Sequence, residues 1–303
     1  MSKVLRGTLY TLAAGTAWGL SGTSGQYLME HGFLALSLTN VRLLLAGLVL
    51  MMLAYATNKD SFKEIWKDKS SLLHILIFAI LGLFINQYAY LAAIHETNAG
   101  TATVLQYLCP VGVLVYTCVK DRVAPTVAQV CSMILAIGGT FLIATHGQIN
   151  QLSMTPKGLF LGIFSAFTYA LYILLPIGLI KRWGGMLVIG IGMTIAGILL
   201  LPFSGIFQHQ WQFRLDILLA LVGIIVIGTI FAYTVFLKGT SLVGPVKSSL
   251  LASIEPISAV FFAFIIMNER FYLLDFVGMG MILLAVLLIS VKDLILEKKK
   301  GLL

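Results

Sequence analysis

Long apolar stretches recur along almost the whole chain, and they constrain its fold more than any other feature. Each is about 20 residues long, the length that a helix needs to cross the hydrocarbon core of a bilayer. Only short polar joints separate them, which leaves no room for a soluble domain. The ten stretches cover residues 7–28, 36–57, 72–94, 98–119, 125–145, 157–180, 184–203, 216–238, 243–267 and 272–291. The sequence therefore predicts an all-α integral membrane protein with ten transmembrane helices.

The composition agrees with this class, because the chain lacks the residues that cover a soluble protein. Hydrophobic residues make up 59% of the 303 residues and charged residues 11%, whereas a soluble domain has about 25% charged residues. The net charge is +8, but the basic residues form short clusters between apolar stretches. That distribution argues against nucleic-acid binding and for a lipid bilayer as the partner of the outer surface.

The lysines and arginines predict the orientation in the membrane. With the N-terminus in the cytoplasm, 16 of the 20 basic residues fall inside and four fall outside, namely Arg42, Lys157, Arg214 and Arg270. The positive-inside rule then places both termini in the cytoplasm, with 292–303 as a cytoplasmic tail. We expect the lysine-rich joint 58–71 to be a solvated loop, and His95 and Glu96 to lie in a solvated outer loop.

The chain also repeats itself. Pro110 in the fourth stretch aligns with Pro256 in the ninth at a shift of 146 residues, and Trp18 aligns with Tyr169 at a shift of 151. Each copy holds five spans, an odd number, so the second copy enters the membrane from the opposite side. We predict inverted repeats over 7–145 and 157–291. Secondary transporters are often built this way, with the substrate site near the midplane.

Glu255 is the strongest candidate for function, because it falls at the centre of the stretch 243–267. A charge at that depth costs about 2.5–3.5 kcal/mol on insertion scales. Glu255 is either a site for protons or a cationic substrate group, or a protonated packing residue. Pro256 follows it and frees the carbonyl four residues back, at Ala252, as Pro110 does in the first copy. These two kinks are either hinges or packing bends.

Amide and aromatic side chains gather at mid-span positions, and Gln26 belongs to this pattern. Facing lipid they would lack partners, so most should point inward. There they either line a cavity, offering rings for stacking and amides for hydrogen bonds, or join helices to one another. As a set they favour a polar cavity. The candidate substrate-binding residues are Trp18, Asn86, Gln87, Tyr90, Gln106, Tyr107, Tyr169, Tyr172 and Tyr233.

Small residues mark one face of the first stretch. Gly15, Gly19, Gly22 and Gly25 form a groove that favours close helix contact, although they also make the helix easier to bend. The three cysteines lie in apolar stretches without disulfide or zinc-ligand spacing, and no catalytic motif is visible. We therefore expect no enzyme activity, no metal and no cofactor.

These features together resemble the EamA family of the drug/metabolite transporter superfamily. The resemblance rests on Ala17-Trp18-Gly19, on Arg42 at the head of the second stretch, and above all on the series Glu255-Pro256, Glu269-Arg270 and Gly278. The chain looks most like uncharacterised bacterial inner-membrane members. The resemblance implies ten helices in two inverted five-helix EamA repeats, a central cavity, and export or exchange of amino acids and related metabolites. Cys109 stands where the second copy has Glu255, so a symmetric pair of carboxylates is not expected.

The sequence thus predicts a secondary transporter that moves a small metabolite by alternating access. Export of an amino acid or related compound is the first hypothesis, and uptake of a cationic nutrient such as a quaternary amine is the alternative. No ATPase motif is present, so an ion gradient or exchange would supply the energy, with proton coupling at Glu255 as one option. The oligomeric state stays open, and a monomer is compatible with the sequence.

Overall fold

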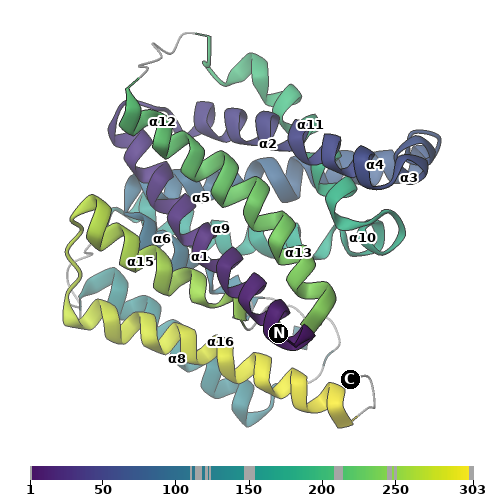
Figure 1. Ribbon diagram of the computed structural model, residues 1–303. Coiled ribbons are helices and arrows are strands. Elements are labelled where there is room, and N and C mark those ends of the chain that lie inside the picture. The colour runs from purple at the N-terminus through teal and green to yellow at the C-terminus, as the bar shows by residue number, and fades with distance from the viewer. Residues whose placement is uncertain are drawn as a thin grey trace.

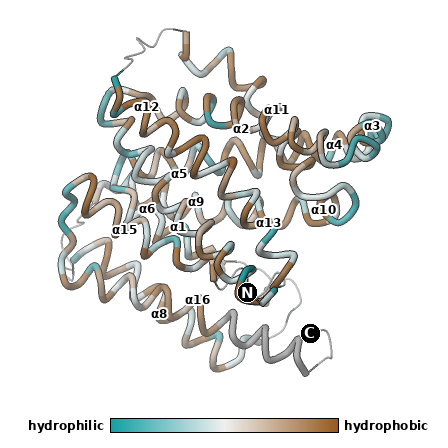
Figure 2. Tube along the Cα trace, in the orientation of Figure 1, coloured by the Kyte–Doolittle hydropathy of each residue, from teal (hydrophilic) through white to brown (hydrophobic). Residues whose placement is uncertain are grey.

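The computed structural model describes residues 2–109, 111–112, 118–119, 122, 124–146, 154–207, 214–243, 248 and 251–299. Across these ranges every regular element is a helix, and the helices pack side by side in one bundle (Figure 1). Hydrophobic residues dominate along most helices, while hydrophilic residues concentrate at helix ends and in short connecting segments (Figure 2). This distribution is the one that apolar stretches with short polar joints predict.

The helices of the first half follow the predicted stretches closely. They are α1 (Lys3–Glu30), α2 (Ala35–Thr57), α3 (Lys59–Ile65), α4 (Lys69–Ile77), the π-helix η1 (Phe78–Phe84), α5 (Ile85–Glu96), α6 (Ala99–Gln106) and α8 (Val127–Thr145). The helices α4, η1 and α5 continue one another and cover the single stretch predicted at 72–94.

The second half has the same organisation. Its helices are α9 (Pro156–Leu174), α10 (Ile177–Trp183), α11 (Gly185–Leu200), the 3₁₀-helix η2 (Leu201–Phe203), α12 (Leu215–Leu221), the π-helix η3 (Val222–Phe231), α13 (Ala232–Val243), α15 (Ile254–Met267) and α16 (Leu273–Lys299). The continuous run α12–η3–α13 covers the stretch predicted at 216–238.

Within the described part of the chain, six helical runs are long and apolar enough to cross a membrane. They are Ala35–Thr57, Lys69–Glu96, Val127–Thr145, Pro156–Trp183, Gly185–Phe203 and Leu215–Val243, and shorter apolar helices cover Ile254–Met267 and Leu273–Ala285. The prediction of an all-α, multi-pass membrane protein is confirmed, while the count of ten spans stays a prediction.

The joint 58–71 differs from its predicted loop, because it contains the helix α3 and the start of α4. The Asn58 side chain accepts a hydrogen bond from the backbone of Ser61 and caps α3, and Asp68 caps α4 through Ser71. Ile65 is fully buried. The lysines obscured this pattern, since one buried apolar residue and two polar caps are enough to order a short helix against the bundle.

The contacts between the two halves are symmetric. A helix of one half packs either on the equivalent helix of the other half, or in a pair that has a counterpart with the two halves interchanged. The second helix of one half packs on that of the other (α2 on α11), and the fifth spans likewise (α8 on α16), at opposite edges of the bundle (Figure 1). The pairing of α1 with α13 has its counterpart in the pairing of α5 with α9. The π-helices η1 and η3 begin 144 residues apart, at Phe78 and Val222. Two repeats related by an approximate two-fold axis produce this kind of symmetric pairing.

Close contacts at small residues hold these pairs together, as predicted for the first stretch. A Cβ atom added at Gly19 would come within 2.6 Å of the Ser258 side chain and 2.7 Å of the backbone nitrogen of Ala259. One added at Gly47 in α2 would meet the backbone of Thr194 in α11 at 2.6 Å. Because these neighbours are largely backbone, the glycines set how closely the helices approach.

Candidate functional site

Glu255 lies at a break in the chain of helices rather than inside a continuous span. Ser253 forms a turn, α15 begins at Ile254, and Glu255 occupies its first turn with 8% of its surface exposed. The predicted burial of this acid is therefore found, but at the N-terminal end of a short helix. That end carries unpaired backbone N–H groups and a partial positive charge, which favour an acidic group.

The equivalent helix of the first half breaks at the same place. The helix α6 ends at Gln106, and Tyr107 and Leu108 form a turn, which is the position of Ser253 once the 146-residue shift is applied. Pro256 follows the break in α15 as its predicted kink requires, whereas Pro110 lies outside the described residues. Whether these breaks act as hinges stays a prediction.

Tyr107 joins the two breaks. Its hydroxyl oxygen lies 3.0 Å from the carbonyl oxygen of Ala252 and 3.0 Å from Oε2 of Glu255. The Ala252 carbonyl is the acceptor that Pro256 frees, because proline has no N–H to donate to it. A side chain of the first half thus satisfies the backbone of the second half and contacts its one mid-span acid.

Arg42 lies deeper than its expected place at the head of the second stretch, where it counted only weakly among the outer charges. The helix α2 begins at Ala35, so Arg42 lies two turns inside it, and it is only 6% exposed. Its Nε donates to the Thr229 hydroxyl at 2.8 Å, and Nη2 approaches the Gly228 carbonyl at 3.5 Å. The sequence did contain a signal for this residue, namely a single arginine in an apolar stretch. Like a buried acid, a buried arginine in a membrane span is costly and is a candidate for function.

Arg42 and Glu255 form no ion pair with each other, although both are buried and close enough to interact electrostatically. Tyr90 interacts with both groups. Among the described residues, Arg42 and Glu255 are therefore a buried positive and a buried negative side chain that are separated rather than paired, whereas the buried Asp275 contacts His146. Buried charges without a direct partner are costly, so this separation points to a group that enters between them.

Four of the predicted aromatic residues form one wall. Trp18 of α1 lies edge-on to Tyr233 of α13, with ring centroids 5.6 Å apart, and Tyr172 of α9 lies 6.4 Å from Tyr233. Tyr169 stacks on Tyr172 at 5.7 Å and interacts electrostatically with Glu255. Phe236, which the sequence did not single out, completes the wall 5.1 Å from Trp18.

Most of the predicted amides and Tyr90 join helices to one another. The Oδ1 atom of Asn86 accepts from the Thr168 hydroxyl at 3.2 Å and from Gln106 at 3.4 Å, which links α5, α9 and α6. The Tyr90 hydroxyl bonds to Thr103 of α6 at 2.6 Å. Gln87 differs, because it is 5% exposed and neither end of its amide has a partner among the described residues. The role of these residues as substrate selectors stays a prediction.

Gln26 closes one end of the bundle. Its Oε1 accepts from the backbone N–H of Ala99 at 2.8 Å, and its Nε2 donates to Glu269 at 2.6 Å and to Glu30 at 3.1 Å. It therefore ties α1 to the first residue of α6 and to the segment just after α15. Beside it, α6 packs on α15 around Gly100.

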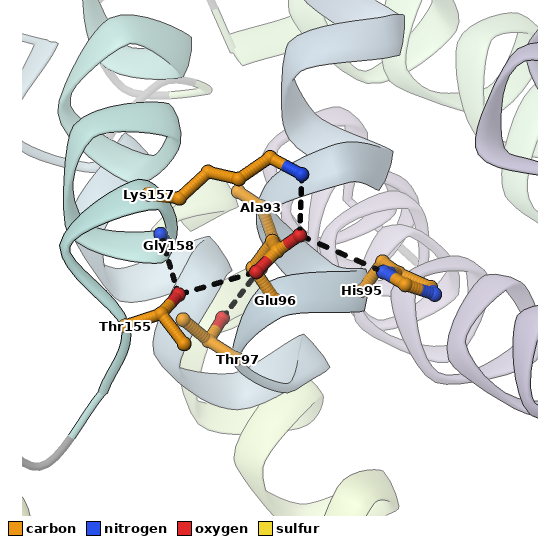
Figure 3. A network of polar contacts seen from close by, with 7 residues as sticks. All are labelled: Ala93, His95, Glu96, Thr97, Thr155, Lys157 and Gly158. Carbon is orange, nitrogen blue, oxygen red and sulfur yellow. Dashed lines mark hydrogen bonds and ion pairs between the residues drawn. The ribbon is translucent and has the colours of Figure 1, made fainter.

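A second link at this end is the network around Glu96 (Figure 3). Glu96 ends α5 and pairs with Lys157 in the first turn of α9 at 2.7 Å, and it accepts from the Thr155 hydroxyl at 3.2 Å. Glu96 differs from its predicted place in a loop, because α5 extends to it and reaches the start of α9, and its side chain stays 18% exposed. His95, whose side chain is 60% exposed, is solvated as predicted.

A third link at this end joins the two edge helices. Nδ1 of His146, the residue that ends α8, lies 2.6 Å from Oδ1 of the buried Asp275 in the first turn of α16. Three polar contacts between segments far apart in the sequence thus gather at one end of the bundle. At the opposite end, Asp68 pairs with Arg182 at 2.7 Å and links α4 to α10.

The family of the chain follows from comparison with known proteins. The model of the EamA-like transporter family matches twice, over residues 5–145 and 156–291. The chain belongs to this family. The two matches correspond to the two halves whose helices pack on each other in symmetric pairs.

Similar proteins agree with this assignment. The chain is 35% identical over 291 residues to an uncharacterized inner membrane transporter, YicL, of Salmonella typhimurium, a match that covers 96% of this chain and 97% of that one. It is 25% identical to an uncharacterized transporter of Archaeoglobus fulgidus, over 89% of this chain and 92% of that one. A solved crystal structure superposes with a TM-score of 0.60 at 16% identity, covers 96% of this chain and supports the fold. The chain is therefore a membrane transporter of the EamA family.

Proposed function

We propose that the protein is a secondary transporter that exports a small metabolite, an amino acid or a related compound, across the cytoplasmic membrane of a bacterium. Ten spans in two inverted sets of five, with both termini in the cytoplasm, would carry out alternating access. The observation that carries the proposal is the separated pair of buried charges, Arg42 and Glu255, beside an aromatic wall and a helix break.

The bonds of Tyr107 support proton coupling at Glu255. A tyrosine hydroxyl has one proton, yet two acceptors lie at 3.0 Å. When Glu255 is protonated, it can donate to the Tyr107 oxygen while Tyr107 donates to Ala252, and all groups are satisfied. When Glu255 is ionised, Tyr107 can serve only one of the two acceptors. An unsatisfied buried group costs about 1–3 kcal/mol, so proton binding changes the stability of the helix break.

The surroundings of Glu255 favour exchange over simple binding. The groups that interact with it among the described residues are the hydroxyls of Tyr107, Tyr90, Tyr169 and Tyr233 and the guanidinium of Arg42. Among these, no second acid is present to hold a proton while Glu255 binds a cation. A proton and a cationic substrate group therefore compete for the same carboxylate. Inward movement of the proton down its gradient would then drive the substrate outward, which is export.

The breaks suggest how access alternates. The helix α6 precedes the break at Tyr107 in the proposed fourth span, and α15 follows the break at Ser253 in the proposed ninth span. These two helices pack against each other. With the proposed orientation they close the outer side. Their separation, with bending at the two breaks, would open the site outward.

Uptake of a cationic nutrient such as a quaternary amine remains the second candidate. The observation that favours it is the wall of Trp18, Tyr172 and Tyr233, because aromatic faces attract quaternary ammonium groups. In this case the aromatic rings, rather than Glu255 alone, would hold the positive charge.

Transport in proteoliposomes tests the proposal. The vesicles are preloaded with amino acids or choline, and flux is measured with and without a pH gradient for the native protein and for Glu255→Gln. We expect a pH gradient to drive amino-acid flux in the native protein. The variant lacks the carboxylate that holds the cationic group, so it should bind substrate more weakly, and its remaining exchange should not respond to the gradient. Glu64→Gln, a substitution of an exposed glutamate in α3, is the matched control. Identical responses of Glu255→Gln and native protein would remove Glu255 from the mechanism.

A further inference from the structure

The surroundings of Arg42 point to a second group that binds the same ligand as Glu255. Arginine offers five N–H donors in a planar fork. In this protein Nε is held by Thr229 at 2.8 Å and one donor of Nη2 approaches the Gly228 carbonyl at 3.5 Å, while Nη1 has no bond to any described residue. A buried guanidinium is normally saturated, because unmade bonds are costly there. Arg42 therefore keeps donors available for a group that is absent from the protein itself.

Thr229 shows how the fork is held in place. Its hydroxyl accepts from Arg42 and donates to the carbonyl of Ile224 at 2.8 Å, five residues earlier in the π-helix η3. The proton of Thr229 is committed to the backbone, so its oxygen serves as a fixed acceptor for Nε. This arrangement orients the guanidinium and leaves its outer edge, Nη1 and Nη2, for bidentate contact with a planar anion.

Ser21 gives an independent observation at the same place. It is 2% exposed, and its hydroxyl has no hydrogen-bond partner in the part of the chain that the structure describes. Other hydroxyls of α1 bond to the carbonyl four residues earlier, as Thr11 and Ser24 do at 2.9 Å. The Ser21 side chain lies against the α-carbon of Gly228, since a Cβ atom there would collide with it. An unpaired hydroxyl therefore lies beside the residue whose carbonyl Arg42 approaches.

We propose that Arg42 and Ser21 form a carboxylate subsite, and that the transported ligand is a zwitterion whose positive group lies toward Glu255. This inference rests on the proposed function, because it places the transported ligand between the two charges. Arg42 is the one buried basic side chain among the described residues, so the site offsets a single negative charge. A carboxylate fits that limit, whereas a phosphate monoester carries about −1.5 to −2. A ligand with a bare amine would leave Arg42 unpaired.

Binding measurements with matched probes test the subsite. The probes are the twenty proteinogenic L-amino acids, followed, for each one that binds, by its decarboxylated amine and its methyl ester. Thermal stabilisation and calorimetry on the purified protein give the dissociation constants. We expect at least one amino acid to bind and both carboxylate-free analogues to bind at least about tenfold more weakly, because a site built for a hydrogen-bonding group rejects a ligand that lacks it.

Variants separate a ligand contact from a structural role. In Arg42→Met the amino acid and its amine should bind with similar, weak affinity, and Ser21→Ala should lower amino-acid affinity without affecting the amine. Arg6→Gln, at an exposed arginine of α1, is the matched control and should keep the native discrimination. If Arg42→Met does not fold, Ser21→Ala and the analogue series still decide the question.

The outcomes distinguish this inference from the proposed function. Equal binding of an amino acid and its amine by the native protein would overturn the carboxylate subsite, even if transport of amines were observed. Failure of all twenty amino acids to bind would also overturn it. If discrimination is seen but no flux occurs in proteoliposomes, the subsite stands and the transporter mechanism fails.

Discussion

The substitution Gln26→Leu should open the end of the bundle at which α6 and α15 meet. Leucine has about the same reach as glutamine and fits a buried position, but it makes no hydrogen bonds. It removes the bond to the Ala99 N–H and the bonds to Glu269 and Glu30. The bonds to Ala99 and Glu269 are formed only while α1, α6 and the end of α15 are together, whereas the bond to Glu30 lies within α1. The substitution therefore acts on the closed state and leaves the open state nearly unchanged.

The expected shift follows from the number of these bonds. Hydrogen bonds between membrane helices are worth about 0.6 kcal/mol on average and about 1.7 kcal/mol at most. The two bonds between helices give about 1.2 kcal/mol, and a difference of 1.4 kcal/mol is tenfold in an equilibrium constant. The closed-to-open ratio should thus fall roughly sevenfold. A ratio of about 20 would become about 3, which makes the open state directly observable.

Distance measurements between spin labels can detect that state. Labels at His95→Cys and Arg270→Cys, both exposed, report on the ends of α5 and of α15 in a background without the three native cysteines. Pulsed dipolar spectroscopy in lipid should show one distance in the native background and an added, longer population in Gln26→Leu. Ligand binding should then change the two populations in opposite directions.

The matched control is Thr11→Val on the same helix. Thr11 is buried and its hydroxyl bonds only to the carbonyl of Gly7, so this variant loses a bond without losing a link between helices. Its distance distribution should remain that of the native protein. If Gln26→Leu also keeps the native distribution while its thermal stability falls, then Gln26 contributes to folding and not to closure, and the reasoning is refuted.

Three further predictions concern packing, pH and the helix break. Gly19→Ala should lower the free energy of unfolding by about 1–3 kcal/mol, because it forces a methyl group into the neighbouring backbone. Gly178→Ala, with open space around it, should leave the free energy of unfolding unchanged. The backbone N–H of Ser71 that bonds to Asp68 lowers the pKa of this carboxyl. The ionised carboxylate therefore stabilises the fold above its unfolded-state pKa, and this stabilisation is lost as the pH falls through the lowered pKa. Asp68→Asn should flatten the acid side of a curve of stability against pH. Pro256→Ala restores an N–H that can bond to Ala252, and it should slow flux in proteoliposomes more than it weakens ligand binding.

The sequence predicts the helices well because bilayer thickness dictates their length. The stretch predicted at 36–57 is α2 at Ala35–Thr57, and that at 125–145 is α8 at Val127–Thr145. The effect of Pro256 is equally local, since a missing N–H acts on the carbonyl four residues back. The break before α15 and the freed acceptor could therefore be predicted without the structure. The close approach of α1 at Gly19 also follows from residue size alone.

The contacts of the site could not be predicted in the same way, because they join residues far apart in the chain. Gln26 contacts Glu269 across 243 positions, and Arg42 contacts Thr229 across 187. Hydropathy and charge counts assign a residue to a side of the membrane and say nothing about its partner. The contacts of Arg42 could not be predicted for that reason, because its place near the head of a stretch does not show which residues it contacts.

The two halves contribute unequally to the site, and this inequality bears on the energetics of transport. Cys109 of the first half aligns with Glu255 of the second half. It is buried and, unlike Glu255, has no carboxylate. Under the proposed mechanism, one acid at the breaks would limit exchange through this site to one proton per cycle. If the ligand is a zwitterion, each cycle moves one net positive charge inward, so both the membrane potential and the pH gradient drive export. If the ligand is a bare cation, the exchange is electroneutral and only the pH gradient counts. Flux in proteoliposomes clamped at a set potential with a potassium ionophore, at equal pH on both sides, therefore separates the two ligands. A response to potential supports the Arg42 subsite, and flux that ignores potential contradicts it.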